Sequence, residues 1–413
     1  MSACTSSAGF RVDEVTLPST GTLTSFATAW VPRTGLLCPY VLGQVDIGAG
    51  AMVFAHIRGL PDDAGTPVAV RLALNPNRPP DRASGSNTRS SQPNKKDHPM
   101  SENVPEAAVA EYKRGFACVD GEFVPAATAS VSIFDHSFLY GDGVFETIIC
   151  RGGRLFALRP HLDRLWASCQ YLQITPPYDQ EQITAFITEL AKRNELSDGY
   201  VRVVISRGEG YPVSDPRKAL KSKLVISMQG APAVTRPPDV GVKLAIASTR
   251  RTPPICLEPR VKSNNYLNHI VAKLEAIAAG ADDAIMLDLE GNVAELPVAN
   301  IFARHGDTLA TPPSNGILAG ITRETILRLV AEGAAGPGLR VVQRVMTAYD
   351  LFTAAEVFIV GTGSGVAFVE SIDGRRIGDG TMGPATKRLM DAYTELLGRD
   401  GAEPDLQLTT KEA

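Results

Sequence analysis

This sequence of 413 residues has few cysteines, few aromatic residues and no long apolar run. No two of its cysteines form a CxxC pair, so the sequence predicts neither a disulfide framework nor a sulfur-ligated zinc site, and we expect no metal. It contains no stretch of about 18 apolar residues that would predict a transmembrane helix. The first residues also lack the basic and apolar regions of a signal peptide. We therefore expect a cytoplasmic protein without a membrane partner.

An excess of charge of one sign is also missing. The chain has 41 Lys and Arg against 45 Asp and Glu, which gives a formal net charge of −4. Such a surface has no general attraction for nucleic acid or anionic lipid, so we expect a small-molecule or protein partner. With 44% hydrophobic and 21% charged residues, the composition is that of a globular protein. The length predicts about two to four compact units.

Apolar residues are nearly absent from residues 75–106, which are rich in Pro, Ser, Asn and charge. A segment that cannot bury apolar surface favours a flexible linker. This linker separates a first domain, residues 1–74, from a longer body. We divide the rest of the chain into subdomains 107–236 and 237–398 and a C-terminal tail, 399–413.

The first domain contains short apolar and β-branched runs separated by Pro, Gly and Asp, which predict strands at 21–30, 40–45, 52–57 and 68–73. A small all-β barrel would bury such strands. The runs GTLTSFATAW, CPYVLGQVDIGAGAMVFAHIRGL and GTPVAVRL resemble the OB-fold of acyl-CoA-associated domains that accompany thiolase-like enzymes. The resemblance implies an acyl-CoA enzyme as a partner, with this chain as a docking subunit. OB barrels also bind single-stranded nucleic acid, but acidic residues balance the arginines here, so we expect no nucleic-acid partner.

The body mixes strand-like and helix-like patterns in both halves, which predicts an α+β fold in two subdomains. Asp120-Gly121 and Gly152-Gly153 predict the turns of two hairpins, over 115–124 and 144–158. The remaining patterns predict helices at 160–172, 183–190, 265–279 and 322–332, and strands at 200–206, 223–228, 242–247, 284–288, 299–304 and 356–360.

Two glycine-containing loops are candidate anion sites. Gly316–Thr325 passes through a glycine turn into a predicted helix, whose free N–H groups and dipole attract anions. Gly361–Gly365 follows a predicted strand and offers hydroxyl and N–H groups to anionic oxygens. Either loop alone is also typical of ordinary capping. Their occurrence together with Lys262 and Glu295 favours a functional site, because a lysine amine is needed to form a Schiff base with an aldehyde cofactor.

Seven ordered blocks between Tyr112 and Gly398 resemble one family. They are VSIFDHSFLYGDGVFETIICRGGRLFALRPHLDRL, YVRVVISRGEG with SDPRK, VKSNNYLNHIVAKLEA, DAIMLDLEGNVAELPVANIF, GILAGITRETIL, FIVGTGSGV and GPATKRL. The set resembles the class IV (fold type IV) pyridoxal-phosphate aminotransferases, and looks most like the branched-chain amino-acid aminotransferases. The resemblance implies a two-subdomain α+β fold with pyridoxal 5'-phosphate between the subdomains. It also implies a homodimer in which the partner chain touches each active site.

The resemblance also implies a role for individual residues. Lys262 would bind the cofactor aldehyde and move the substrate proton, and Glu295 would pair with the pyridinium nitrogen. The other cofactor-binding residues that it implies are Arg164, Ile321, Thr322 and Thr362 at the phosphate, Leu318 against the ring and Tyr266 at the phenolic oxygen. The implied substrate-binding residues are Tyr140 and Phe145 around the side chain, and Tyr200, Arg202, Gly363 and Ser364 at the carboxylate.

The implied activity is transfer of the amino group of Leu, Ile or Val to a 2-oxo acid, 2-oxoglutarate, because the implied side-chain pocket is apolar. Branched-chain enzymes commonly read Phe-Glu-Gly-Ile-Arg where this chain has Phe145-Glu-Thr147-Ile-Ile149. Phe-Glu-Thr also occurs in aminodeoxychorismate lyases, which eliminate pyruvate, so a lyase is an alternative. D-Amino-acid aminotransferases typically carry an Arg-x-His pair that is missing after Arg207. We expect framework hydrogen bonds rather than catalysis from the histidines of these blocks, His136, His161 and His269.

Overall fold

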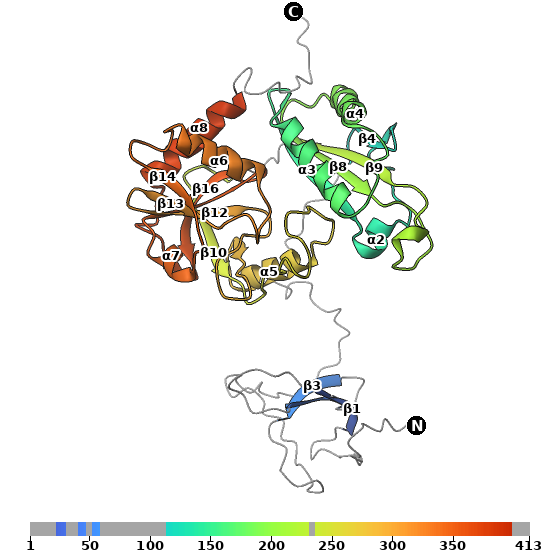
Figure 1. The fold of residues 1–413 in the computed structure, drawn as a ribbon, viewed down its shortest axis with the longest axis horizontal. Helices are drawn as coiled ribbons and strands as arrows, with labels where there is room; N and C mark the ends of the chain where they lie inside the picture. The colour runs from blue at the N-terminus through green and yellow to red at the C-terminus, as the bar shows by residue number, and fades with distance from the viewer. Residues whose placement is uncertain (1–21, 30–39, 47–51, 58–112, 231–235, 399–413) are drawn as a thin grey trace, which may run out of the picture. The chain divides into compact units, whose positions relative to one another are not determined.

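The computed structural model describes residues 22–29, 40–46, 52–57, 113–230 and 236–398 (Figure 1). The chain forms two compact units, residues 1–94 and 95–413. The predicted linker at 75–106, the strand at 68–73 and the tail at 399–413 lie outside the described residues. None of the described helices has the length and apolar character that crossing a bilayer requires.

The described part of the first unit is a three-stranded antiparallel sheet. Its strands are β1 (Thr22–Ala29), β2 (Tyr40–Asp46) and β3 (Met52–Ile57), in the order β1-β2-β3. These strands agree with three of the four that the sequence predicts. The residues that would close the predicted barrel lie outside the described part of the chain.

The second unit begins with a lobe built on a six-stranded antiparallel sheet in the order β5-β4-β9-β8-β6-β7. Helices α3 and α4 lie against this sheet (Figure 1). The elements of the lobe are β4 (Phe116–Val119), β5 (Glu122–Pro125), α2 (His136–Tyr140), β6 (Gly143–Arg151), β7 (Arg154–Leu155), α3 (Leu158–Tyr171), α4 (Gln180–Arg193), β8 (Gly199–Ser206), the 3-10 helix η1 (Pro216–Lys218) and β9 (Lys223–Gly230).

Both predicted hairpins form, because each turn has residues that accept a left-handed backbone. Asp120 and Gly121 have φ values of 51° and 84°, and Gly152 and Gly153 have 54° and 73°. A two-residue turn with positive φ at both positions matches the twist of the flanking strands. The second hairpin is shorter than predicted, because β7 ends at Leu155 and helix α3 begins at Leu158.

The second lobe is an eight-stranded mixed sheet in the order β11-β10-β16-β15-β12-β13-β14, with β17 paired to β16. Strand β15 is buried from Glu356 to Val360, which agrees with its continuous Val-Phe-Ile-Val run, and β12 is buried from Asn300 to Ala303. The elements of the lobe are β10 (Val242–Ile246), α5 (Leu267–Ala278), β11 (Asp283–Ile285), β12 (Asn300–His305), β13 (Thr308–Thr311), α6 (Ile321–Ala331), β14 (Arg340–Gln343), α7 (Ala348–Phe352), β15 (Glu356–Gly361), β16 (Gly365–Ile372), β17 (Arg375–Arg376) and α8 (Pro384–Gly398).

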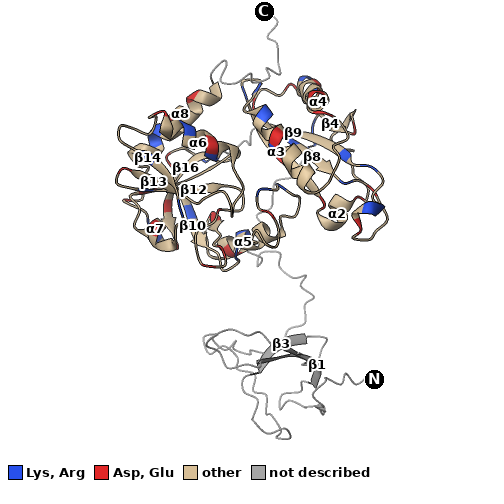
Figure 2. Cartoon of the chain, viewed as in Figure 1, with Lys and Arg blue, Asp and Glu red and all other residues tan. Residues whose placement is uncertain are grey.

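The two lobes of this unit are joined by hydrogen bonds as well as by the chain. Arg164 of α3 donates to the carbonyl of Ala319 at 2.7 Å, and the Tyr200 hydroxyl of β8 donates to the carbonyl of Gly363 at 3.3 Å. Lys and Arg positions are interspersed with Asp and Glu positions along the described ribbon of both lobes (Figure 2). The two hydrogen bonds place the loop before α6 and the turn between β15 and β16 where the lobes meet.

Candidate active site

The loop before α5 holds Lys262 against the first lobe. The Phe145 N–H of β6 donates to the Lys262 carbonyl at 2.9 Å, and the Asn264 N–H donates to the Gly143 carbonyl at 2.8 Å. These bonds fix the backbone on both sides of the lysine side chain. The Lys262 amine donates to the Tyr266 hydroxyl at 3.0 Å, which joins the loop to the N-cap residue of α5.

Phe145 lies at the centre of a cluster of predicted site residues. Its buried ring lies 3.8 Å from the Arg202 guanidinium carbon, 4.6 Å from the Lys262 amine and 5.2 Å from the Tyr266 ring centroid. Burial lowers the pKa of Arg202. Among the described residues no carboxylate pairs with Arg202, so its charge is available to an added carboxylate. The structure thus brings four predicted residues of the lysine site together.

Glu295 lies in the loop between β11 and β12 and is buried. Its Oε1 accepts from Arg251 Nε at 2.8 Å, and its Oε2 accepts from the Leu318 N–H at 3.0 Å and from Asn300 Nδ2 at 3.3 Å. Burial raises the pKa of Glu295, and the positive charges of Arg251 and Lys262 oppose this effect. The predicted residue Leu318 therefore contacts Glu295 through its backbone.

Arg164 and the start of α6 form a second group of hydrogen-bond donors. Arg164 donates to both carboxylate oxygens of Glu146, at 2.7 and 2.9 Å, and to the Ala319 carbonyl beside Leu318. Helix α6 begins at Ile321, and its N-cap Gly320 provides no side-chain cap. The N–H groups of its first turn therefore remain available to an anion.

The other predicted anion loop is the turn between β15 and β16. Gly361 pairs with Gly365, which leaves Thr362, Gly363 and Ser364 as the turn residues. Gly363 and Ser364 are exposed and Thr362 is half-buried. Because the Tyr200 hydroxyl bonds to the carbonyl of Gly363, this predicted pair also meets.

Two other predicted residues have partners that the sequence did not indicate. Thr322, at the start of α6, is buried and its side chain hydrogen-bonds to Tyr393 of α8. Tyr140, at the end of α2, is 40% exposed, and its ring packs edge-on against His136 at 5.3 Å. No contact joins Tyr140 to the Lys262 cluster among the described residues.

The expected framework hydrogen bonds of histidine are present in two cases. His161 Nδ1 lies 2.7 Å from Glu146 Oε2, and His136 Nε2 lies 3.2 Å from the Tyr211 carbonyl. The expectation is wrong for His269, whose Nδ1 is buried without a hydrogen-bond partner among the described residues.

Three residues that the sequence analysis did not assign complete this arrangement. Arg251 and Asn300 contact Glu295, and Glu146 holds Arg164. Arg251 follows another arginine in an unremarkable loop, so its local sequence carries no signal of a buried ion pair. Glu146 belongs to the Phe-Glu-Thr motif, and a glutamate within such a motif could have been predicted to bind one of the site's arginines.

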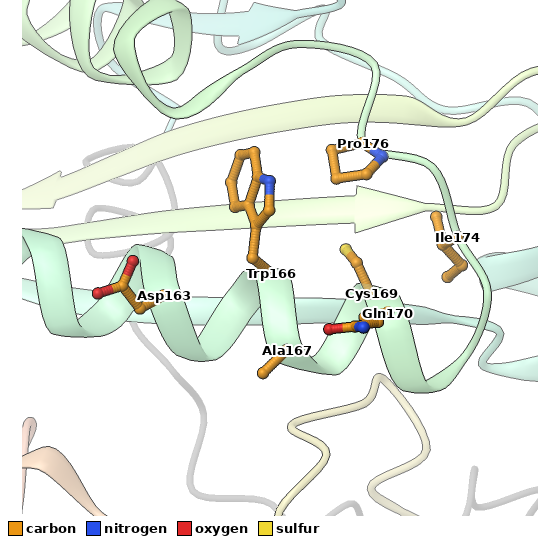
Figure 3. A pocket seen from close by; sticks show the side chains of 7 residues that line it. All are labelled: Asp163, Trp166, Ala167, Cys169, Gln170, Ile174 and Pro176. Carbon is orange, nitrogen blue, oxygen red and sulfur yellow. The ribbon is translucent and has the colours of Figure 1, made fainter.

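A cavity of about 420 Å³ lies elsewhere on the first lobe. It is lined by residues of α3 and the loop after it, including Trp166, Cys169 and Pro176 (Figure 3). None of the predicted site residues lines it, so it is not the candidate active site.

Comparison with known proteins defines the family. The model described as "Amino-transferase class IV" matches residues 143–372. A provisionally named branched-chain-amino-acid aminotransferase of Methanocaldococcus jannaschii is 40% identical over 282 residues, 67% of this chain and 95% of that protein. The branched-chain-amino-acid aminotransferase of Pseudomonas aeruginosa is 34% identical over 293 residues, 68% of this chain and 93% of that protein. This chain belongs to the class IV aminotransferases.

A solved structure of similar fold is the T.th. branched-chain amino acid aminotransferase with pyridoxamine 5'-phosphate. It matches with a TM-score of 0.68 and 30% sequence identity, covering 72% of this chain and 99% of that one. Structures of the same T.th. enzyme with N-(5'-phosphopyridoxyl)-L-glutamate and with 4-methylvaleric acid each match with a TM-score of 0.67 over the same shares, at 31% and 30% identity. The predicted α+β fold of the body is confirmed.

Proposed function

We infer that this protein is a pyridoxal-5'-phosphate-dependent aminotransferase that transfers the amino group of a branched-chain amino acid to 2-oxoglutarate. The observation that supports this most is the placement of the Lys262 amine. It bonds to Tyr266, and its charge acts on the buried carboxylate of Glu295, while Arg164 and the uncapped start of α6 supply anion donors. The aldehyde of the cofactor would bind Lys262, its pyridine nitrogen Glu295, and its phosphate Arg164 and the start of α6.

The side chains also have hydrogen-bonding capacity left for the cofactor. Each nitrogen of Arg164 donates one hydrogen bond to a protein acceptor, which leaves one N–H on Nη1 and one on Nη2. Glu295 accepts bonds from Arg251, Asn300 and Leu318, whereas a carboxylate offers about four acceptor sites. Both groups can therefore bind an added partner without losing those that they have.

Pyridoxal 5'-phosphate supplies an aldehyde that binds amines and a pyridine ring that withdraws electrons from the α-carbon of the amino acid. Lys262 would bind the aldehyde through Nζ, and the same nitrogen would carry the α-proton of the amino acid. Tyr266 orients this amine and the phenolic oxygen of the cofactor. Glu295 holds a proton on the pyridine nitrogen, which keeps the ring electron-withdrawing. The phosphate is held by Arg164, the N–H groups of Ile321 and Thr322, and Thr362, with Leu318 against the ring.

The substrate residues divide into an apolar and a polar group. Phe145, with Tyr140 and the half-buried Thr147, faces the side chain of the amino acid, and the absence of a positioned polar partner there suits Leu, Ile and Val. Arg202 lies opposite Thr147 in the β6–β8 pairing and binds the carboxylate. Tyr200, Gly363 and Ser364 complete the carboxylate site. In support, the structures of the T.th. enzyme contain a glutamate adduct and 4-methylvaleric acid.

An amino-donor panel tests this function. Purified full-length protein is supplied with pyridoxal 5'-phosphate and 2-oxoglutarate, and glutamate formation is measured from Leu, Ile, Val, Ala, Phe and D-Ala. We expect turnover with Leu, Ile and Val and none in Lys262→Ala. Release of pyruvate from aminodeoxychorismate without any oxo acid would instead identify a lyase.

We further propose a homodimer formed through an apolar surface on α2 and α5. We call it the α2–α5 surface, and its exposed residues are Ile133, Phe134, Phe138, Leu267, Ile270, Val271 and Leu274. Asn264 Nδ2 donates to Ser137 Oγ at 2.6 Å, which joins α2 to the residues before α5. Exposed apolar surface of this extent favours contact with another protein, and its proximity to Lys262 agrees with a partner chain near the active site.

For residues 1–74 we propose an OB-like barrel that docks onto an acyl-CoA enzyme. The three antiparallel strands β1, β2 and β3 support an all-β domain. The test is a pull-down with the full chain and with a chain that begins at Met100, each offered a thiolase-like enzyme. Retention by the full chain alone would support docking, and retention by neither would contradict it.

A further inference from the structure

His269 lies in the first turn of α5, three residues after Tyr266 and seven after Lys262. Tyr266 is the N-cap residue of α5 and His269 lies three residues on, so these two side chains share one face at the start of the helix, while Lys262 lies in the loop before it. The imidazole of His269 stacks on the Tyr266 ring, with ring centroids 4.5 Å apart and an angle of 23° between the planes. Tyr266 in turn accepts the hydrogen bond from the Lys262 amine. The histidine is thus linked to the lysine through one aromatic ring.

The surroundings of His269 leave one of its ring nitrogens without a hydrogen bond. His269 is only 8% exposed, and its Nδ1 has no hydrogen-bond partner among the described residues. Leaving a buried polar nitrogen unpaired is unfavourable. An apolar side chain such as leucine would fill the same space without that cost. What the imidazole adds over leucine is a flat aromatic face, and Tyr266 lies against it.

Burial and two positive charges keep this imidazole neutral. Burial, and then the charges of Arg251 and Lys262, lower the pKa of His269 to about 3. Arg251 lies on the loop after β10 and is paired with Glu295, while Arg202 of β8 interacts electrostatically with Tyr266. At neutral pH the histidine therefore neither exchanges protons with Lys262 nor adds a further cation to the site.

We propose that His269 is a positioning residue, whose flat ring holds the ring of Tyr266 by stacking and so keeps the Tyr266 hydroxyl against the Lys262 amine. The proposal rests on the proposed function, because the amine held in this way is the one that binds the cofactor aldehyde. His269 acts through Tyr266 and not on the substrate itself.

The test compares three variants of the full-length holoenzyme. His269→Leu removes the aromatic face, and His269→Phe keeps it without the nitrogens. His305→Leu is the control, because it makes the same histidine-to-leucine change in β12. For each, the visible absorbance of the cofactor bound to Lys262 is titrated with pH, and kcat and KM for leucine are measured. The apparent melting temperature of each apoprotein reports the fold independently of the cofactor.

We expect His269→Leu to shift the midpoint of this titration by about 0.5 pH unit or more, because the Lys262 amine loses a fixed hydrogen-bond partner. We expect kcat to fall about tenfold, with little change in KM. His269→Phe should restore both quantities toward the parent, and His305→Leu should leave them unchanged. His269→Met, whose flexible side chain also lacks a flat face, replaces His269→Leu if the latter does not fold.

Two results would overturn the proposal. A parental midpoint in folded His269→Leu or His269→Met would show that stacking does not hold Tyr266. A His269→Phe variant as impaired as His269→Leu would show that the nitrogens matter rather than the ring face. Failure of the proposed function is seen separately, as a parent protein whose cofactor absorbance does not depend on Lys262. In that case the proposed role of His269 would be overturned together with the proposed function.

Discussion

Arg251 and Glu295 form a buried ion pair, in which Arg251 Nε donates to Glu295 Oε1 at 2.8 Å. The two side chains are 8% and 5% exposed. Desolvation makes the charged form of a buried carboxylate unfavourable, and the adjacent guanidinium opposes that effect. The Arg251 charge therefore offsets part of the burial that raises the pKa of Glu295, the residue proposed to pair with a pyridinium nitrogen.

Removing the arginine of this pair should destabilise the protein strongly. Arg251→Met leaves the Glu295 carboxylate buried without its counter-charge, so we expect the free energy of unfolding to fall by about 3–5 kcal/mol. Pyridoxal 5'-phosphate should also bind more weakly. Urea unfolding of the apoprotein measures the first effect. Arg344→Met is the matched control, because it breaks the more exposed pair with Asp350 and should cost at most about 1 kcal/mol. Equal losses in the two variants would contradict the importance of burial.

Glu146 should make the stability of the first lobe sensitive to acid. Burial opposes its ionisation, but the charge of Arg164 and hydrogen bonds from His161 and Arg164 lower its pKa to about 2. A group whose pKa is lower in the folded state stabilises the fold above its unfolded value, near 4.5, and loses that contribution as the pH falls toward 2. The contribution at neutral pH is about 3 kcal/mol.

Unfolding free energies of the parent and of Glu146→Gln measure this contribution. The glutamine variant should be less stable at pH 7, and the difference should shrink between about pH 5 and pH 3. Glu189→Gln is a control, since Glu189 is an exposed glutamate bonded to an exposed arginine, Arg193. A difference between parent and Glu146→Gln that did not change with pH would argue against the low pKa.

The sequence predicts those contacts of the site that join residues close in the chain. It does not predict the contacts that depend on the pairing of distant strands. Lys262 and Tyr266 lie four residues apart in one short segment, so their side chains can meet without pairing of distant parts of the chain, and the glycine turn before α6 makes that loop a candidate anion site from the sequence alone. Arg251 and Glu295 are 44 residues apart, and they meet only because β10 and β11 pair in parallel. No local pattern encodes that pairing.

The same difference between local and distant contacts explains which elements of the fold the sequence predicts. The Asp120-Gly121 turn defines a hairpin through two residues, so the sequence predicts it correctly. Strands β13 and β14 were not predicted, because they are four residues long and β14 is a half-exposed edge strand without a strong apolar pattern. Helix α2 was also missed, since its five residues are too few to show a helical period.

Arg202 should contribute to substrate binding and little to stability. It lies 3.8 Å from the centre of the Phe145 ring and interacts with Tyr266, and no carboxylate pairs with it among the described residues, so its charge remains available to a substrate carboxylate. A lost charged hydrogen bond is worth about 1.5–3 kcal/mol, so Arg202→Met should raise KM for leucine about 10-fold to 100-fold. Arg193→Met is the control, because Arg193 also lies over an aromatic ring, Phe123, at 4.4 Å. An unchanged KM in Arg202→Met would place the carboxylate elsewhere.

The α2–α5 surface should control the oligomeric state. Ile270 is 52% exposed on α5, so Ile270→Lys should change the stability of a monomer by no more than about 0.5 kcal/mol. In a dimer through this surface the same change buries an unpaired charge, which is strongly unfavourable. Sedimentation equilibrium should therefore show a parent dimer and a dissociated variant. Val345→Lys, at an exposed valine outside this surface, should remain dimeric. If the partner chain contacts the active site, the dissociated variant must lose activity in proportion to its monomer fraction, and added protein that restores the dimer must restore turnover.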